Sequence, residues 1–339
     1  MSRYVPVLLA FLLSIPAPAA LEASAKRRAP RRQRQVRPER PLTQEIVNDA
    51  GLTAPVGPGS SGAAVLRAQV LLARAHFSCG EIDARYGANL KGAIAAFRKS
   101  RGLSESGLVD SETWRALNAD TGRVLERLAV APGDVAGPFI KIPEDMMEKA
   151  KLPSLSYSSA LEAIAEKYHV SPALLRKLNP GASLDRAGEE IVVPNVGVPA
   201  PGKAASIAVS KSAGAVFVLD AQGKTIARYP ATTGSEHDPL PLGNWKVVGV
   251  ARNPPFHYNP DLFWDAKETH DKAPIAPGPN NPVGVAWIDL SKQHYGIHGT
   301  PEPSQIGKTQ SHGCIRLTNW DVTELSQMVS PGTPAVLEE

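Results

Sequence analysis

Apolar residues recur at helical spacing between residues 60 and 118. Three short segments in this stretch place apolar side chains three or four positions apart, as expected for helices that bury one face. Polar residues that can cap a helix stand before each segment. The predicted core positions are Leu66, Val70, Ala73, Ile94, Phe97, Trp114 and Leu117, and the predicted caps are Ser60 or Ser61, Asn89, and Asp110 or Ser111. The pattern predicts a compact three-helix module.

A second short pattern covers residues 155–194. Residues 155–158 are typical of a strand, and residues 159–168 repeat apolar positions at helical spacing. Ser171 and Pro172 indicate a second helix start, because proline suits the first helical position. The β-branched residues 191–193 are typical of a closing strand. We therefore expect a small βααβ module.

The chain becomes β-rich from Ala204 onward. Strands are predicted at residues 206–209, 215–219, 225–229, 245–250 and 283–288, with a hairpin turn at 220–223. This spacing indicates a sandwich or barrel-like sheet over residues 204–338. Residues 253–282 interrupt it with Pro, Asn, Asp and four aromatic residues, so we expect this insertion to act as a lid or binding loop. The expected fold is therefore multidomain α+β.

Residues 1–25 are typical of an export signal. Arg3 precedes an apolar stretch of 13 residues, 4–16, and small residues with A-x-A cleavage patterns follow. A permanent anchor is the weaker alternative, because a bilayer span needs roughly 20 residues. We expect an exported protein of the periplasm or cell wall with no stable transmembrane anchor.

The basic character of the chain is local. The sequence holds 37 Lys and Arg against 33 Asp and Glu, but residues 26–40 alone contain eight basic residues and one acidic residue. We expect a Pro- and Arg-rich linker over residues 26–59, either a solvated spacer or an arm that attracts anionic polymers. The remainder is mildly acidic, which argues against a nucleic-acid partner. Residues 119–154 are expected to form a second linker.

The densest set of chemically active residues lies in two segments, YGIHGT and SHGCIRL, which ten residues separate. A thiolate nucleophile needs a base, hydrogen-bond donors for an oxyanion and a charge that places the substrate. Cys314 is the candidate nucleophile, His298 the candidate base, and Arg316 a charge that can hold a carboxylate. Backbone N–H groups around Gly313 are the candidate oxyanion donors.

Other interpretations of this cluster are weaker. An inert buried Cys314 would leave the glycines beside His298 and Cys314 unexplained. A zinc site formed by His298, His312 and Cys314 is poorly spaced, because two of these ligands are only two residues apart. We therefore expect no metal site. With only two cysteines in the chain, a disulfide scaffold is excluded, and Cys79 is expected to be a packing residue, with pairing to Cys314 as the alternative.

Two accessory segments resemble known wall-binding modules. Residues 60–118 resemble the peptidoglycan-binding domain 1 family, through VLRAQVLLARAHFSCGEIDARYG and the closing GLVDSETWRAL. Residues 155–194 resemble a LysM domain, through SYSSALEAIAEKYHVSPALLRKLNPGASL and EEIVVPNV. LysM modules bind glycans that contain N-acetylglucosamine. The two resemblances imply peptidoglycan as the binding partner.

The segments YGIHGT and SHGCIRL, with PGPNNPVGVAWIDL upstream, resemble the L,D-transpeptidase (YkuD) catalytic domain family over about residues 204–337. The resemblance implies that Cys314 is the nucleophile, that His298 is the general base, and that the carbonyl of Gly299 orients the base. Asn319 falls where the family often has an asparagine. The other catalytic residues implied are His312 and Gly313, and the implied substrate-binding residues are Arg316, Tyr295 and Ser311.

The same resemblance implies a cysteine acyltransferase that acts on peptidoglycan stem peptides through a thioester. An amine of a neighbouring stem then resolves the thioester, and the bond that is broken supplies the energy, so no nucleotide or cofactor is needed. A protein attached to the wall is another acceptor that the resemblance leaves open. The alternatives are an L,D-carboxypeptidase or hydrolase of the same fold, with water as acceptor, and a non-catalytic peptidoglycan-binding protein.

Overall fold

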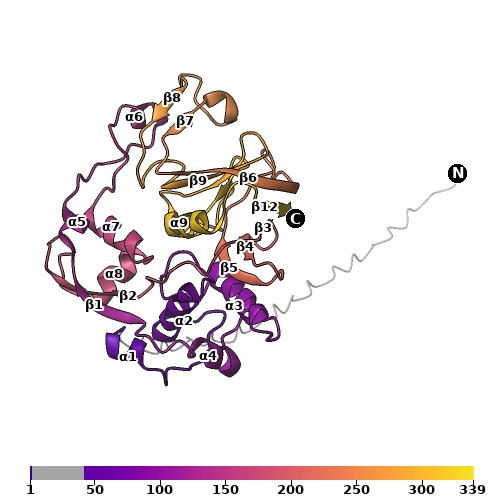
Figure 1. Cartoon of the computed structure of the whole chain (residues 1–339). Helices are drawn as coiled ribbons and strands as arrows, with labels where there is room; N and C mark the ends of the chain where they lie inside the picture. Colours follow the sequence, from indigo (N-terminus) through magenta and orange to yellow (C-terminus); the bar gives the residue numbers. More distant parts are fainter. Residues whose placement is uncertain (2–41) are drawn as a thin grey trace. The chain divides into compact units, whose positions relative to one another are not determined.

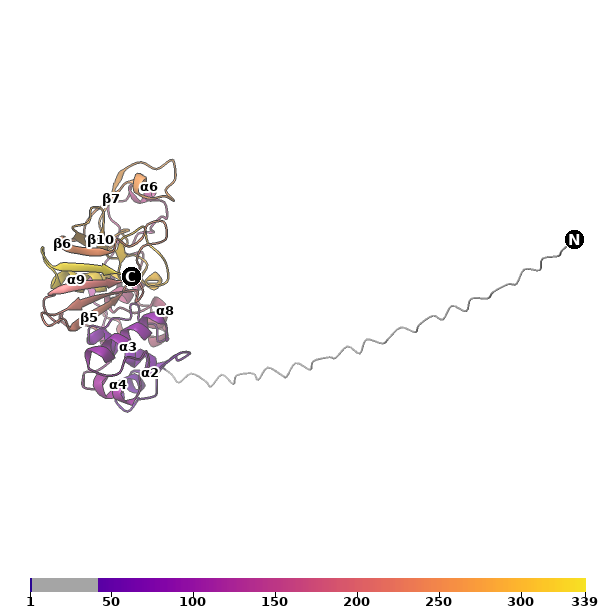
Figure 2. The ribbon, with the colours of Figure 1, turned by 90° about the vertical axis from the view of Figure 1, so that its right-hand side faces the viewer.

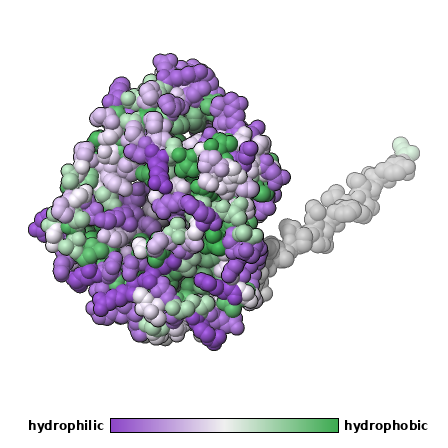
Figure 3. Space-filling model, viewed as in Figure 1, coloured by the Kyte–Doolittle hydropathy of each residue, from purple (hydrophilic) through white to green (hydrophobic). Residues whose placement is uncertain are grey.

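The computed structural model describes Met1 and residues 42–339 (Figure 1). Residues 2–25 of the predicted export signal and residues 26–41 of the predicted basic linker therefore lie outside the described residues. Residues 42–339 belong to one compact unit. Hydrophilic side chains cover much of the face shown in Figure 3, while the apolar residues gather in three buried clusters.

The three helices predicted for residues 60–118 are confirmed. They are α2 (Ala63–Arg74), α3 (Ala88–Ser100) and α4 (Ser111–Leu117), and a short helix that was not predicted, α1 (Gln44–Asn48), packs against them through the buried Val47. The cap at Asp110 is confirmed, because its carboxylate accepts the N–H of Thr113 at 2.9 Å. The other predicted caps are wrong, because glycines occupy both N-cap positions. One of them, Gly62, has a φ of 93° that disfavours a residue with a Cβ.

The βααβ prediction is right about the helices and the closing strand and wrong about the first strand. The confirmed elements are α7 (Ala160–Lys167), α8 (Pro172–Leu178) and β2 (Glu190–Pro194). Residues 155–158 are not a strand. The antiparallel partner of β2 is β1 (Leu125–Ala129), which lies inside the span expected to be a linker. Two short helices, α5 (Pro132–Val135) and α6 (Met146–Lys149), follow β1 before α7 begins.

An eight-stranded sheet dominates the second half of the chain and confirms the β-rich prediction. Its strand order is β11-β10-β9-β6-β12-β3-β4-β5. The strands are β3 (Ser206–Ser210), β4 (Ala215–Leu219), β5 (Thr225–Pro230), β6 (Gly243–Arg252), β9 (Ala286–Leu290), β10 (Gly296–His298), β11 (Ile315–Arg316) and β12 (Pro334–Glu338). Most neighbours are antiparallel, while the β3–β12 and β10–β11 pairs are parallel.

The sheet is curled, and its two edges meet. Just beyond β5, Thr232 exchanges backbone hydrogen bonds of 3.0 and 2.9 Å with Arg316 of β11. The helix α9 (Asn319–Met328) packs its apolar side chains Val322 and Leu325 into the same core as the strands. Of the two architectures expected, the sheet is therefore closer to the barrel-like one.

The helical module covers the edge strand β5, as the positions of α3 and β5 in Figures 1 and 2 show. The N–H of Ser78 donates to the carbonyl of Arg228 at 2.9 Å, and the N–H of Arg228 donates to the carbonyl of His76 at 2.8 Å. The buried Arg228 guanidinium also donates to the carbonyl of Ser78 at 3.0 Å. Backbone groups that an exposed sheet edge would leave unpaired are thus satisfied by the module.

The insertion at residues 253–282 has its own small core. It contains the hairpin β7 (Phe256–Tyr258) and β8 (Ala273–Ile275) and the 3₁₀ turn η1 (Pro260–Leu262). A second 3₁₀ turn, η2 (Pro303–Gln305), lies in the spacer between the segments YGIHGT and SHGCIRL. Leu155 is buried with Tyr258 and Ile275, and α6 lies beside β7 and β8 (Figures 1 and 2). Part of the segment expected to be a linker therefore completes the insertion.

None of the helices in the described part of the chain has both the length and the apolar character needed to cross a membrane.

Candidate active site

Parallel pairing of β10 with β11 brings the two chemically active segments together. Ile297 pairs with Ile315, and His298 pairs with Arg316. Paired residues on adjacent strands point to the same face of a sheet, and side chains alternate along each strand. The two isoleucines are fully buried on one face. His298 and Arg316 therefore share the other face with Cys314, which immediately precedes β11.

His298 is held in a single orientation by its neighbours. Its ring is 5 % exposed and stacks on the indole of Trp287, with the ring centroids 5.3 Å apart. Its Nδ1 lies 2.7 Å from the carbonyl oxygen of Gly299. A proton on Nδ1 donates to that carbonyl, which leaves Nε2 as the atom that can accept a proton.

The environment of His298 favours the neutral imidazole. Burial, assisted by the charge of Arg316, lowers the pKa of His298 to about 4, against the opposing effect of the hydrogen bond to Gly299. Near neutral pH this imidazole is therefore uncharged and able to act as a base.

Burial also raises the pKa of the Cys314 thiol, while a hydrogen bond from the Gly296 backbone and the charge of Arg316 act in the opposite direction. The thiol donates weakly to the carbonyl of His294, with Sγ 3.7 Å from the oxygen. Thiol and neutral imidazole are therefore the resting forms. To act as a nucleophile, the Cys314 sulfur would therefore have to pass its proton to a neighbouring base.

The turn that presents Cys314 is built by Ser311 and Gly313. The Ser311 hydroxyl is buried and donates to the carbonyl of Cys314 at 2.5 Å, and the Ser311 N–H donates to Thr233 at 3.0 Å. Gly313 has a φ of 97°, and a Cβ there would lie 2.7 Å from the ring of Tyr295. Ser311 thus fastens the turn, and only glycine fits between the turn and Tyr295.

His312 faces the insertion rather than the sheet. Its Nε2 lies 2.9 Å from Oδ1 of Asp265. Its ring contacts Phe263 edge to face at 5.1 Å and lies 5.8 Å from Trp264. Its Nδ1 is buried and has no hydrogen-bond partner among the described residues. The two histidines of the cluster are therefore anchored to different parts of the molecule.

Arg316 leaves its guanidinium available. Its backbone is engaged with Thr232, but its side chain makes no hydrogen bond or ion pair with any residue of the stretch 42–339. Burial lowers the pKa of Arg316, and the nearby Cys314, Glu302 and Asp265 oppose that shift. A partly buried guanidinium without a partner is suited to bind a carboxylate in a bidentate manner.

Two families of known proteins match parts of this chain. The L,D-transpeptidase catalytic domain (YkuD) family matches residues 204–337, and the "Putative peptidoglycan binding domain" family matches residues 61–117. The "Putative L,D-transpeptidase YkuD" of Bacillus subtilis is 35 % identical over 175 residues, which cover 51 % of this chain and 90 % of the relative. Its namesake from Bacillus licheniformis is 34 % identical, with the same coverage of each chain.

The chain belongs to the L,D-transpeptidase family. The similarity to the Bacillus relatives is longer than residues 204–337, so it continues into the segment that precedes the sheet. Among solved structures, the L,D-transpeptidase of Xylanimonas cellulosilytica (residues 123–326) is 16 % identical, with a TM-score of 0.36, and the match covers 82 % of this chain and 95 % of that one. The peptidoglycan-binding domain and the family together imply peptidoglycan as the substrate.

Two neighbours of this candidate site were not predicted from the sequence. Trp287 supports His298 because the β9–β10 register places them opposite each other. Asp265 reaches His312 from the insertion. Register between strands and the path of a long insertion are both non-local, so neither contact has a signal in the sequence.

A zinc site is not supported by the described part of the chain. Residues 42–339 contain no group of three or more His, Cys, Asp or Glu side chains arranged to hold a metal ion. Cys79 is 4 % exposed, and burial raises the pKa of its thiol. Both Cys79 and Cys314 are free, so the packing role predicted for Cys79 is confirmed.

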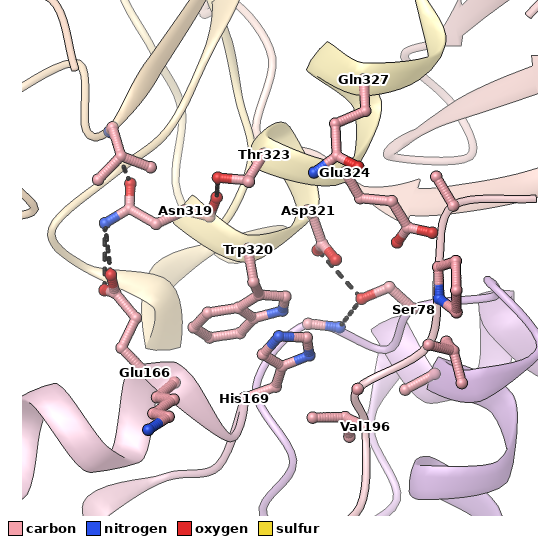
Figure 4. A pocket seen from close by; sticks show the side chains of 18 of the residues that line it. Ser78, Glu166, His169, Val196, Asn319, Trp320, Asp321, Thr323, Glu324 and Gln327 are labelled. Carbon is pink, nitrogen blue, oxygen red and sulfur yellow. Dashed lines mark hydrogen bonds between the residues drawn. The ribbon is translucent and has the colours of Figure 1, made fainter. Parts of the chain in front are cut away.

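A cavity of about 380 Å³ lies away from Cys314, between α7, α9 and the helical module (Figure 4). Its wall includes Glu166, Asp321 and the stacked rings of His169 and Trp320, whose centroids are 5.0 Å apart. Burial raises the pKa of both carboxyl groups to about 7. The cavity is therefore a polar junction between modules, and it is separate from the residues that surround the thiol.

Proposed function

We propose that this protein is a cysteine-dependent L,D-transpeptidase that acts on peptidoglycan stem peptides through a thioester on Cys314. The observation that carries the proposal is the β10–β11 pairing, which puts Cys314, His298 and Arg316 on one face of the sheet. Each group needed for acyl transfer is then present at one place: nucleophile, neutral base and a charge for substrate.

The acyl transfer follows from these positions. Cys314 Sγ attacks the carbonyl between the third stem residue, a diaminopimelate at its L-centre, and the terminal D-Ala. His298 Nε2 takes the thiol proton and returns it to the amine of D-Ala as the C–N bond breaks. An amine of a neighbouring stem then attacks the thioester, its proton passes to His298, and the thiol is restored.

Two groups stabilise and place the substrate in this mechanism. The N–H groups of Gly313 and Cys314 lie in the tight turn, where they can donate to the oxyanion. The unpaired guanidinium of Arg316 binds a stem carboxylate. Gly299, through its contact with His298 Nδ1, keeps the base in the productive tautomer. His312 and Tyr295 border the substrate on the side of the insertion.

The accessory modules serve to hold the enzyme on its insoluble substrate. The helical module belongs to a peptidoglycan-binding family. We assign to β1, α7, α8 and β2 a LysM-like role in glycan binding, supported by their strand pairing and by the two adjacent helices. This arrangement fits an exported enzyme of the periplasm or cell wall.

Intact-protein mass spectrometry tests the proposal. The full chain, incubated with a carbapenem, should gain one covalent adduct, because carbapenems acylate members of this family. Cys314→Ala should gain none, and the matched variant Cys79→Ala should react like the wild type, since that thiol is buried in another core. An adduct on Cys314→Ala would overturn the proposal. Purified muropeptides in place of the drug then show whether an amine or water resolves the thioester.

A further inference from the structure

Glu166 lies on α7, outside the sheet, yet its carboxylate reaches the first residue of α9. Both carboxylate oxygens lie 3.1 Å from Nδ2 of Asn319, a contact that Figure 4 shows directly. The hydroxyl of Tyr157 donates to the same carboxylate at 2.9 Å. Glu166 is thus a fixed acceptor for two donors from different segments.

Asn319 is buried and fully engaged. Besides Glu166, its Nδ2 donates to the carbonyl of Pro279 at 3.1 Å, and its Oδ1 accepts the N–H of Val285 at 3.2 Å. It is 2 % exposed. The side chain has one orientation that satisfies all its polar atoms, and the carboxylate of Glu166 is one of the partners that define it.

The other side of Asn319 touches the backbone that supports the base. A Cβ built on Gly299 would collide with Oδ1 of Asn319, and so would a Cβ built on Gly284. The carbonyl of Gly299 is the group that lies 2.7 Å from Nδ1 of His298. Continuous contacts therefore lead from α7 through Asn319 and Gly299 to the imidazole.

We propose that Glu166 is a positioning residue for acyl transfer, which fixes Asn319 against Gly299 so that the Gly299 carbonyl holds His298 in the productive orientation. This inference rests on the proposed function. Without the carboxylate, one N–H of the Asn319 amide loses its buried acceptor. Because an unsatisfied buried donor is costly, the Asn319 side chain should then rotate toward the adjacent cavity. The accessory module would then be part of the catalytic apparatus, and not only a means of attachment.

The ionised carboxylate should hold Asn319 more firmly than the protonated form, because charge-assisted hydrogen bonds are the stronger ones. Burial raises the pKa of Glu166 to about 7, with Glu162 adding to the shift and the hydrogen bonds from Tyr157 and Asn319 opposing it. The titratable groups around this carboxyl are Tyr157, Glu162, Lys167, His169, Asp321 and Glu324. The acylation rate should therefore rise modestly as the pH increases through about 7.

The test measures carbapenem acylation of the full chain from pH 6 to pH 8. At pH 8, Glu166→Ala should acylate about tenfold more slowly than wild type, and Glu166→Gln should recover part of that loss, because its carbonyl can still accept from Asn319. Glu166→Gln should also lack the rise near pH 7. In an Asn319→Ala background, Glu166→Gln should have no further effect, as expected for two residues in one pathway.

Asp321→Asn is the matched control. Asp321 lies in the same cavity and its carboxyl also has a raised pKa, but it accepts from Ser78 of the helical module. This variant should keep the wild-type rate and pH profile. The inference would be overturned if the wild type is acylated and both Glu166→Ala and Glu166→Gln show the wild-type rate and pH profile. It would also be overturned if Asp321→Asn lowers the acylation rate as much as Glu166→Ala does, or if a lower melting temperature explains the slower acylation of Glu166→Ala. No acylation of the wild type would instead contradict the proposed function.

Discussion

The two sides of Cys314 differ in how they hold a histidine. On the side of the sheet, His298 is buried, stacked on Trp287 and in contact with a backbone carbonyl. On the side of the insertion, His312 is partly exposed and interacts with the side chain of Asp265. A sheet with paired backbones fixes its side chains firmly, whereas a contact to an exposed carboxylate is adjustable.

This difference suits a division of labour. A general base must be neutral, desolvated and closely aligned, and the buried, stacked His298 on the sheet side meets these conditions. The insertion side presents aromatic surface instead, since Trp264 is 63 % exposed beside His312. The insertion itself is tied to the start of α6 by Asp145, whose carboxylate lies 2.6 Å from Lys267 and 3.1 Å from His270. We therefore assign base catalysis to the sheet side and adaptation to substrate to the insertion side.

Replacing each histidine gives the largest expected difference. His298→Ala should slow carbapenem acylation by about 100-fold to 10,000-fold, the usual cost of removing a general base. His312→Ala should remain measurably active, because it removes only a contact with the insertion. Intact-protein mass spectra over time provide both rates. Rapid acylation of His298→Ala together with none of His312→Ala would reverse the assignment.

The sequence predicted those parts of the fold that local patterns determine. The helices α2, α3, α4, α7 and α8 and the strands β3 to β6 have their own periodicity, so their positions were predicted within a few residues. The strand β1 was missed because its partner β2 lies far along the chain, and pairing of that kind leaves no local pattern. The predicted strand at 155–158 failed for the same reason: the N–H of Leu155 pairs with Pro277, and its carbonyl pairs with Asn280 in the insertion.

The candidate site also has features that the sequence predicted and features that it did not. The candidate nucleophile and the candidate base were proposed from the sequence because their residue types and spacing point to thiol chemistry. The support of His298 by Trp287 depends on strand register, and the contact of Glu166 with Asn319 depends on how two modules pack. Such contacts depend on tertiary structure and leave no local pattern, so they could not be predicted from a single sequence.

The contact between His312 and the insertion can be removed without changing any residue of the sheet. Asp265→Ala removes the partner of His312 Nε2, and the exposed position of this pair limits the expected effect to at most about fivefold in substrate KM. Asp261→Ala is a matched control, because Asp261 also lies on the insertion and pairs with Lys272 away from His312. Steady-state kinetics with a stem tetrapeptide separates the two. A collapse of kcat in Asp265→Ala would show that His312 takes part in the chemical step.

The smallest effect expected is the response of the wild type to mild acid, and it distinguishes the two histidine environments. With the pKa of His298 near 4, the neutral fraction of this base falls by only about a tenth between pH 6 and pH 5. The neutral fraction of a solvated imidazole with the ordinary pKa of about 6.5 would fall about eightfold over the same interval. Glu166 is mostly protonated throughout this window, so it adds little to the slope.

The measurement is the carbapenem acylation rate at pH 5, 5.5 and 6, with near-UV circular dichroism to confirm that the protein stays folded. That control matters because a histidine kept neutral by burial makes the folded state bind fewer protons than the unfolded chain. The free energy of unfolding is therefore not reduced by His298 above about pH 6.5, and it declines as the pH falls toward 4. A nearly constant rate in folded protein supports His298 as the base. A steep fall that is shared by His312→Ala would show that the base titrates like a solvated group, which contradicts a base kept neutral by burial. A steep fall that disappears in His312→Ala would transfer the role to the insertion side.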